Sequence, residues 1–422
     1  MREDTLTVNS FHTSGSSPTG PCRVGLLGFG TVGSAVARRL TSEPAATPFA
    51  LELTHIFDRR AHAKRDGFAE TAALGSKITW TTRVDDILTS DVDIVVEAIG
   101  GTDEAVAWTR AALLAAKSVV TCNKQAVAQH GPALLQLATR QGRQLRFEAA
   151  VGGAMPIVRA VGEGLAGDRV TSIAAILNGT TNAVLSRMEA QRCPLAHALA
   201  DAQARGYAEA DPSADLDGID ARAKLTILCA LAFGLRVDPD RIETRTSAGI
   251  TVQDFDDAAL CGGTIRQVAY AAYEPAASVL TAWVAPSVVP RGSLFAQTTG
   301  PQNAAVITGT FAGEISLSGA GAGGGATAVA VISDLLAIAR DRAAIVPAAT
   351  LSRPDTIIGF TTIDAETAAA AEKTFLRGLR ELCPSTLPDH QGRPEPGRGA
   401  TRAGHRAPVG GCVERGVIAE AV

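Results

Sequence analysis

Residues 206–225, GYAEADPSADLDGIDARAKL, place several carboxylates just before a lysine, a combination that can hold and transfer a proton. Asp220 and Lys224 are four residues apart, so on a helix they lie on one face. The helix continues as LTILCALAFG, an almost wholly apolar run. Burial on such a helix lowers the pKa of a lysine toward the range of an acid–base catalyst, whereas nearby carboxylates counter that shift. The segment predicts either such a catalyst or a surface ion pair where a core helix begins.

A second pattern with chemical meaning is GFGTVG, residues 28–33. It follows an apolar run of strand length, Val24 to Leu27, and precedes residues with helical spacing. A strand, a glycine turn and a helix in this order are the context of the dinucleotide-binding fingerprint, in which the backbone closely approaches a pyrophosphate. The expected cofactor contacts are Gly28, Gly30, Thr31, Val32 and Gly33.

The end of the next strand, FALELTHIFDRR, should decide which dinucleotide binds. Asp58 could accept a hydrogen bond from a ribose 2′-hydroxyl, which favours NAD. Arg59 and Arg60 could instead bind the 2′-phosphate of NADP, although Arg60 fits a solvated turn equally well. The residues leave NAD and NADP open.

A later strand of the same series, KSVVTCNK, ends at Lys124. Ligands of open α/β sheets bind at the carboxyl ends of the strands, so this lysine could face the nicotinamide or the substrate, or simply be solvated. Cys122 is expected to be a buried thiol rather than a nucleophile, because no histidine accompanies it in the motif. The histidines lie outside every motif, so the lysine of the acidic segment is the candidate acid–base group.

The composition excludes several classes of protein. The chain has 422 residues, 46% of them hydrophobic and 19% charged, which suits two or three folded domains. A net charge of −4 and the lack of a basic block argue against a nucleic-acid partner. No stretch approaches the roughly 20 apolar residues of a membrane span. The seven cysteines are scattered without a C-x-x-C pair, which indicates a reducing cytoplasm.

Strands that alternate with helices over residues 21–150 predict an α/β fold, a doubly wound (Rossmann) parallel sheet that binds a dinucleotide. Beyond Gly153 the pattern becomes mixed, which predicts a second, α+β domain over residues 151–320. Its expected strands include 170–178, 305–318 and TAWVAPSVV. A glycine loop and a long apolar helix over 321–342 are expected to return to the first domain.

The two ends of the chain lack the apolar periodicity of the folded regions. Residues 1–20 are expected to form a disordered tail and not a secretory signal. Residues 343–422 form an atypical, largely disordered segment, with at most a strand at 356–361 and a helix at 365–382 before a tail rich in Pro and Gly.

The stretch ILNGTTNAVLSRM, residues 176–188, followed by the acidic segment, resembles homoserine dehydrogenase. The likeness covers roughly residues 22–342 and includes the glycine fingerprint, TCNK, FEAAVGGAMPI and GAGAGGGATA. The Asn-Gly-Thr-Thr-Asn stretch and the acidic segment are its specific parts, since neither is general among dinucleotide enzymes. The family interconverts L-homoserine and L-aspartate 4-semialdehyde with NAD(P)(H), in the biosynthesis of threonine, methionine and isoleucine, and the resemblance implies the same activity here.

The resemblance also implies roles for the charged residues. Lys224 matches the proton donor to the aldehyde oxygen, and Asp215 and Asp220 match residues that help to hold substrate and lysine. Glu209 matches a residue that binds the substrate. Lys124 matches a lysine at the boundary of cofactor and substrate.

Further sites follow from the resemblance alone. Gly321, in the late glycine loop, is expected to approach the cofactor. The loop EAAVGG resembles the family's sodium site, and oxygen ligands suit a hard cation. The implied ligands are Glu148 through its side chain and Val151, Gly153 and Met155 through backbone oxygens.

The same resemblance implies that the second domain catalyses the reaction and forms a homodimer. Longer family members end in a regulatory ACT domain, and residues 343–422 do not show its βαββαβ pattern. Two other kinds of dinucleotide-binding protein would show different residues. Another NAD(P) oxidoreductase for an amino-acid semialdehyde would lack the Asn178–Asn182 motif, and a catalytically silent dinucleotide sensor would lack the set Glu209, Asp220 and Lys224.

Overall fold

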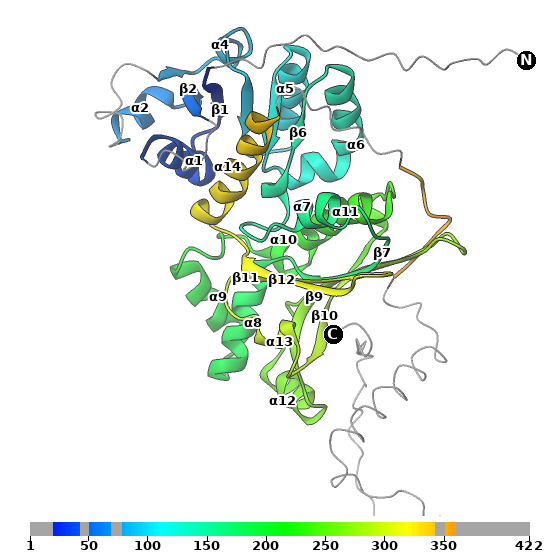
Figure 1. Ribbon diagram of the computed structural model, residues 1–422. Coiled ribbons are helices and arrows are strands. Elements are labelled where there is room, and N and C mark those ends of the chain that lie inside the picture. Colours follow the sequence, from blue (N-terminus) through cyan, green and yellow to red (C-terminus); the bar gives the residue numbers. More distant parts are fainter. Residues whose placement is uncertain (1–19, 43–49, 69–77, 342–350, 360–422) are drawn as a thin grey trace, which may run out of the picture. The chain divides into compact units, whose positions relative to one another are not determined.

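Figure 1 shows the computed structural model, which describes residues 20–42, 50–68, 78–341 and 351–359. Two compact units make up the chain. Unit 1 comprises residues 1–149 and 327–349, and unit 2 comprises residues 150–326 and 350–422. The expected N-terminal tail up to residue 19, the helix at 365–382 and the Pro/Gly-rich tail lie outside the described residues.

Unit 1 is built on a six-stranded sheet in the order β3-β2-β1-β4-β5-β6, and all of its strand pairs are parallel. This order reverses direction at β1, as in a doubly wound dinucleotide-binding fold, and confirms the predicted fold class. The strands are β1 (Cys22–Leu27), β2 (Leu51–Phe57), β3 (Thr79–Thr81), β4 (Ile94–Glu97), β5 (Ser118–Thr121) and β6 (Leu145–Arg146). The main helices are α1 (Thr31–Ser42), α2 (Ala61–Asp66), α4 (Asp85–Leu88), α5 (Asp103–Leu114) and α6 (Lys124–Arg140).

The strands of unit 1 are short apolar runs because both faces of the sheet are covered by helices. Figure 1 shows α14 (Gly324–Arg340, gold) beside the blue and cyan strands, although the last strand of this sheet already ends at Arg146. Its side chains share one core with β1, β4 and α1. Members of that core include Val24, Leu26, Val36, Ile94, Val96, Val331, Leu335 and Ile338.

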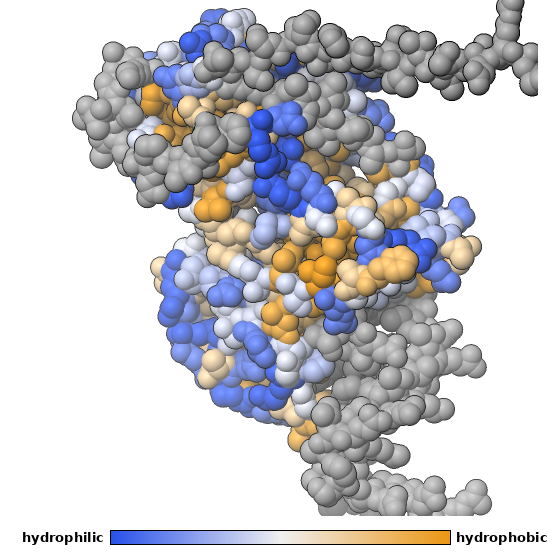
Figure 2. Space-filling view, in the orientation of Figure 1, coloured by the Kyte–Doolittle hydropathy of each residue, from blue (hydrophilic) through white to orange (hydrophobic). Residues whose placement is uncertain are grey.

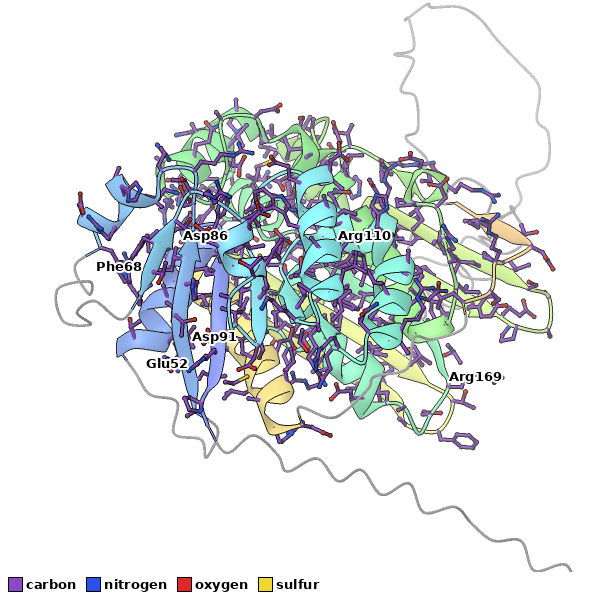
Figure 3. All side chains as sticks on the ribbon, turned by 90° about the horizontal axis from the view of Figure 1, so that it is seen from above. Glu52, Phe68, Asp86, Asp91, Arg110 and Arg169 are labelled. Atoms are coloured by element: carbon purple, nitrogen blue, oxygen red, sulfur yellow. The ribbon has the colours of Figure 1, made fainter. Side chains whose placement is uncertain are left out.

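The parallel sheet has two chemically different edges. In Figure 3, Glu52 and Asp91 mark the edge at which strands begin, and Asp86 lies at the opposite edge, where strands end. The carboxyl ends of all the parallel strands lie at this second edge, and so does the glycine turn that follows β1. The fold therefore brings the polar residues that follow β1, β2, β4 and β5 to one edge.

Unit 2 contains a second sheet, ordered β12-β11-β7-β9-β10-β13, with β8 paired to β10. Its long central pairs are antiparallel, as expected for an α+β unit. The strands are β7 (Val170–Ile176), β8 (Glu243–Thr244), β9 (Gly263–Glu274), β10 (Val279–Pro290), β11 (Gln302–Gly309), β12 (Gly313–Ala320) and β13 (Thr356–Ile358). Its helices are α7 (Ile157–Arg159), α8 (Gly179–Gln191), α9 (Leu195–Ala204), α10 (Ser213–Leu216), α11 (Ile219–Phe233), α12 (Val252–Leu260) and α13 (Leu294–Gln297).

Several helices of unit 2 bury a narrow apolar stripe. Residues of α8, α9, α12 and β9 share a cluster that includes Leu185, Met188, Ala198 and Phe255. Figure 2 shows many hydrophilic residues on the side of unit 2 where Figure 1 places α8 and α9, as expected for helices that bury only one stripe.

Two expectations for unit 2 were wrong in detail. The single strand expected over 305–318 is a hairpin, β11 and β12, which turns at Thr310–Ala312. The carboxylate of Asp168 accepts hydrogen bonds from the amides of Phe311 and Ala312 and so stabilises this turn. Strand β9 was not foreseen, because Arg266 and Gln267 interrupt its apolar pattern, although the fold buries both of them.

Candidate active site

The glycine turn of unit 1 has the geometry that a pyrophosphate requires. A Cβ atom at Gly28 would lie 2.5 Å from the carbonyl oxygen of Ala98, and one at Gly33 would lie 2.1 Å from the carbonyl oxygen of Gly28. Around Gly30, by contrast, nothing lies within 4 Å of such an atom. The outer glycines therefore allow close packing, and the central one leaves open space beside the backbone, where α1 begins at Thr31.

Asp58 holds this turn in place. Its carboxylate accepts hydrogen bonds from the amides of Phe29 (3.0 Å) and Arg60 (2.8 Å) and pairs with the ammonium of Lys64 at 2.5 Å. Lys64 also donates to the carbonyl of Phe29, so the pair binds both backbone polar groups of that residue. Burial acts to raise the pKa of Asp58, but the hydrogen bonds from Lys64, Arg60 and Phe29 outweigh it and lower the pKa.

Arg59 projects into solvent beside α5. It forms an ion pair with Glu104, in the first turn of that helix, and the side chains are 72% and 50% exposed. The ring of Phe57, the last residue of β2, contacts the ring of Trp108 one turn further along α5, at 5.0 Å between centroids. This contact holds the first turn of α5 next to the end of β2.

A buried carboxylate links the loops after β4 and β5. Glu97 is fully buried and accepts hydrogen bonds from the amide of Ile99 (2.9 Å) and from the hydroxyl of Thr121. The Thr121 oxygen accepts the amide of Asn123, whose side chain donates to the carbonyl of Gly101 at 2.7 Å. Burial raises the pKa of Glu97, and the two hydrogen bonds oppose that rise.

Lys124 is the half-buried first residue of α6, directly after this network. Asn123 caps the helix by accepting the amide of Ala126, so the network fixes the backbone from which Lys124 projects. Burial raises the pKa of the neighbouring Cys122 thiol to about 12, which agrees with the expectation of an inert buried thiol.

In unit 2, Lys224 lies on α11 with only 12% of its side chain exposed. Its ammonium donates to the carbonyl of Leu177 at 2.7 Å and pairs at 2.7 Å with the carboxylate of Asp220, one helical turn earlier. Asp220 is 9% exposed. Asp220 and Lys224 therefore lie on one helix face, as their spacing predicts, and their pair is buried rather than exposed at the surface.

Asn178 joins this pair to Asp215. Its side-chain amide donates to Asp215 at 2.6 Å and to Asp220 at 2.9 Å, and its oxygen accepts the amide of Thr181 as the N-cap of α8. No role was assigned to Asn178 from the sequence, although the Asn-Gly-Thr-Thr-Asn motif pointed to it. Asn182, one turn later, instead donates to the carbonyls of Thr298, Gly300 and Gln302 and fixes that loop.

The remaining acidic residues of the segment lie further out. The Glu209 side chain is exposed, and its carbonyl accepts a hydrogen bond from Gln203. Asp211 is exposed, and hydrogen bonds from Ser213 lower its pKa. The hydroxyl of Thr180, in the first turn of α8, donates to the carbonyl of Tyr207 at 2.7 Å and ties the segment to that helix. In the described part of the chain, no hydrogen bond joins Glu209 to Lys224, Asp220 or Asn178.

The residues implied to bind sodium are divided between the units. Glu148, buried, belongs to unit 1, and Val151, Gly153 and Met155 belong to a loop of unit 2. Gly153 has φ +65°, and a Cβ there would lie 2.6 Å from the carbonyl oxygens of Ala320 and Gly321. Within the described residues, no three His, Cys, Asp or Glu side chains form a metal-binding group. The implied sodium site differs from such a group, because three of its four ligands would be backbone oxygens.

Gly321 is buried in unit 2 and packs against Asn303, whose side-chain oxygen would lie 2.2 Å from a Cβ at that position. The exposed part of the late glycine loop is Ala322 to Gly323, where Gly323 has φ +106°. None of the helices in the described part of the chain is both long and apolar enough to cross a membrane.

Comparison with known proteins assigns the family. The model of the family described as "Homoserine dehydrogenase, NAD binding domain" matches residues 28–148, and the one described as "Homoserine dehydrogenase" matches residues 156–336. A homoserine dehydrogenase of Mycobacterium tuberculosis is 38% identical over 330 residues, which cover 76% of this chain and 73% of the relative. The chain belongs to the homoserine dehydrogenase family.

Solved structures of the family agree with this membership. A homoserine dehydrogenase from Thiobacillus denitrificans superposes with a TM-score of 0.72 at 34% identity and covers 80% of each chain. A hyperthermophilic archaeal homoserine dehydrogenase in complex with NADPH gives 0.63 at 26% identity, over 76% of this chain and 98% of the other. The chain is accordingly an NAD(P)-dependent oxidoreductase of amino-acid biosynthesis that acts on a CH–OH group.

Proposed function

We propose that this enzyme interconverts L-aspartate 4-semialdehyde and L-homoserine with NAD(P)(H), as a step toward threonine, methionine and isoleucine. The observation that carries the proposal is the cluster of Lys224, Asp220 and Asn178, in which a nearly buried ammonium is fixed by a carboxylate and a backbone carbonyl. This cluster lies in the two motifs that are specific to the family.

Bound NAD(P)H supplies the hydride that adds to the aldehyde carbon. As the carbonyl oxygen gains negative charge, an ammonium beside it stabilises that charge and delivers the proton, so that aldehyde, hydride and proton give the alcohol. Lys224 is the proposed proton donor. Asp220 and the Leu177 carbonyl take two of the three donors of its ammonium and aim the third.

The carboxylates have a second proposed task. The substrate carries an ammonium of its own, which Glu209 and Asp215 would bind. Asn178 donates to both Asp215 and Asp220, so it keeps two like charges at a fixed separation without neutralising them. Lys124, which the Glu97 network positions in unit 1, is the proposed contact with cofactor and substrate.

The nucleotide is proposed to bind at the glycine turn, with its pyrophosphate over Gly30 and the first turn of α1 and with contacts from Thr31, Val32 and Gly321. A sodium ion bound by Glu148 and the oxygens of Val151, Gly153 and Met155, and a homodimer, are proposed from the family resemblance alone. Oxygen donors fit such a hard cation, and no step of the reaction runs through it.

The reaction is tested with two matched aldehydes. L-aspartate 4-semialdehyde and succinate semialdehyde differ by the amino group, which the proposed carboxylates recognise. Oxidation of NADPH and NADH should be at least about 100-fold more efficient, as kcat/KM, with the amino acid, because a site built for a hydrogen-bonding group rejects an analogue without it. Equal efficiency with both aldehydes, or no turnover of L-homoserine in the reverse direction, would contradict the assignment.

A further inference from the structure

We propose that Gln267, on strand β9, is a positioning residue for the carboxylate of Asp215, and that it thereby sets how strongly the enzyme prefers an amino aldehyde to an aldehyde without an amino group. The inference rests on the proposed function, in which Asp215 binds the ammonium of the substrate. Gln267 touches neither substrate nor cofactor in this proposal, because it acts through the backbone that carries Asp215.

The side-chain amide of Gln267 is a buried hydrogen-bond donor at the end of α10. Only 3% of the residue is exposed, and Nε2 donates to the carbonyl oxygens of Asp215 (3.1 Å) and Leu216 (3.2 Å). A third bond, of 3.3 Å, goes to the hydroxyl of Ser247. The two carbonyls belong to the last two residues of α10. Gln267 thus holds the piece of backbone from which the Asp215 carboxylate projects.

Packing alone does not account for an amide at this position. Ile265 and Ala269, the neighbours on the same face of β9, are 3% and 1% exposed, so the surroundings on this face are apolar. Every hydrogen bond described for Gln267 is donated by its nitrogen, and its buried oxygen accepts none from the described residues. A buried oxygen without a partner lowers stability, and an apolar side chain would avoid that cost. The carbonyls that the nitrogen binds therefore explain the amide.

The Asp215 carboxylate meets Asn178, whose side chain donates to it at 2.6 Å. Asn178 is the N-cap of α8, and this helix is anchored separately. The guanidinium of Arg266, the residue before Gln267 on β9, is buried and pairs at 2.9 Å with Glu189 of α8. Adjacent residues of one strand therefore hold the two helices that meet in the hydrogen bond between Asn178 and Asp215.

The turn after α10 keeps the next helix in place. The carbonyl of Asp215 also accepts the amide of Gly218, which has φ +76° and lies between α10 and α11. A Cβ at Gly218 would lie 3.0 Å from Cγ1 of Val284, so the turn packs closely against β10. Asp220 follows in the first turn of α11. Loosening the end of α10 should therefore move Asp215 and leave Asp220 where it is.

The expected signature is a loss of substrate selectivity and not of catalysis in general. Gln267→Met removes the donor and keeps an unbranched side chain. The carbonyls of Asp215 and Leu216 each keep another donor, the amides of Gly218 and Ser247, so neither is left unpaired. For L-aspartate 4-semialdehyde, kcat/KM should fall about tenfold, mainly through KM, because the substrate ammonium is bound less well. For succinate semialdehyde, kcat/KM should stay within about twofold, and so should the NADPH dissociation constant.

A double-mutant cycle shows whether Gln267 acts through Asp215. Asp215→Asn alone should reduce the same selectivity, because it removes the negative charge that binds the substrate ammonium. Adding Gln267→Met to Asp215→Asn should change kcat/KM by no more than about twofold, since residues of one network are not additive. An equal loss from Gln267→Met in both backgrounds would overturn the proposal, because Gln267 would then act by another route.

Two further variants separate positioning from folding. Gln267→Leu also lacks the donor and should show the same selective loss as Gln267→Met. Ser287→Ala removes a buried hydroxyl from β10, opposite Arg266 in the strand pairing, where it donates to the carbonyl of Ala285. This control should leave the kinetics with both aldehydes unchanged. Urea unfolding of each variant verifies that it is folded under the conditions of the assay.

Native selectivity in Gln267→Met and Gln267→Leu would refute the positioning role, and so would equal losses with the two aldehydes. These outcomes leave the proposed reaction intact, because the native chain would still turn over the amino aldehyde. A native chain that turns over neither aldehyde would instead contradict the proposed reaction, and the inference would fail together with it.

Discussion

The ammonium of Lys224 and the carboxylate of Asp220 lie 2.7 Å apart on one face of α11, and both side chains are at least 88% buried. A buried charge pair of this kind is costly unless its remaining hydrogen-bonding groups are satisfied. Leu177 satisfies the ammonium and Asn178 the carboxylate, so the pair is stable within the fold while one ammonium donor stays available.

Removing the ammonium should abolish proton transfer. Lys224→Ala is expected to lower kcat for L-aspartate 4-semialdehyde by about 100- to 10,000-fold, the usual contribution of general acid catalysis, while NADPH binding changes little. Steady-state kinetics and fluorescence titration measure the two effects. Arg222→Ala is the control. It removes another cation of the same helix, one that pairs with Asp240, and should keep kcat. Near-native kcat in Lys224→Ala would show that the proton comes from elsewhere.

Asn178 has two tasks that different variants separate. Asn178→Ser keeps a side chain that caps α8 but cannot bridge two carboxylates, whereas Asn178→Ala loses both functions. The alanine variant should therefore be less stable than the serine variant by about 1 kcal/mol in urea unfolding. Both should lose about tenfold or more in kcat/KM, since the carboxylate geometry is lost in each. A fully active serine variant would restrict Asn178 to helix capping.

Glu97 should make stability depend on pH. Because burial raises its pKa in the folded state, the unfolded chain ionises this group first as the pH rises. The folded state is then favoured most below the unfolded pKa, about 4.3, and loses this contribution as the pH rises through the folded pKa. Glu97→Gln removes the titration, so its free energy of unfolding relative to the native protein should increase from pH 4 to pH 7. Urea unfolding across that range measures it, and a constant difference would contradict the prediction.

The cysteines should differ sharply in reactivity. Burial raises the pKa of Cys122 and of Cys229 to about 12, so almost no thiolate forms at pH 8, whereas Cys261 is exposed. Iodoacetamide at pH 8 should alkylate Cys261 and leave Cys122 and Cys229 unmodified, as read by peptide mass spectrometry. Cys122→Ala should keep its activity within about threefold, because the thiolate takes no part in the reaction. Rapid labelling of Cys122 in the folded protein would refute its inert character.

Much of the fold was predictable because its signals are local. The central strands β1, β4 and β5 carry short apolar runs that end at glycine or polar residues, and the fingerprint glycines are separated by a few residues. The pairing of Asp220 with Lys224 also followed from helical spacing. Strand β9 was missed because its polar residues, Arg266 and Gln267, are satisfied by partners distant in sequence, among them Glu189, Ala296 and Ser247.

The sequence by itself determined the doubly wound sheet, the glycine turn and the helix that carries Lys224, since each depends on residues close together in the chain. The tertiary structure decided which carboxylates are paired with a cation or a hydrogen-bond donor. Lys64 neutralises Asp58, and Thr121 binds the buried carboxylate of Glu97. Asn178 binds Asp215 and Asp220, which lie 37 and 42 residues further along the chain. A carboxylate's chemistry depends on the charges and donors within a few ångströms of it, and those neighbours are assembled only when distant segments pack together.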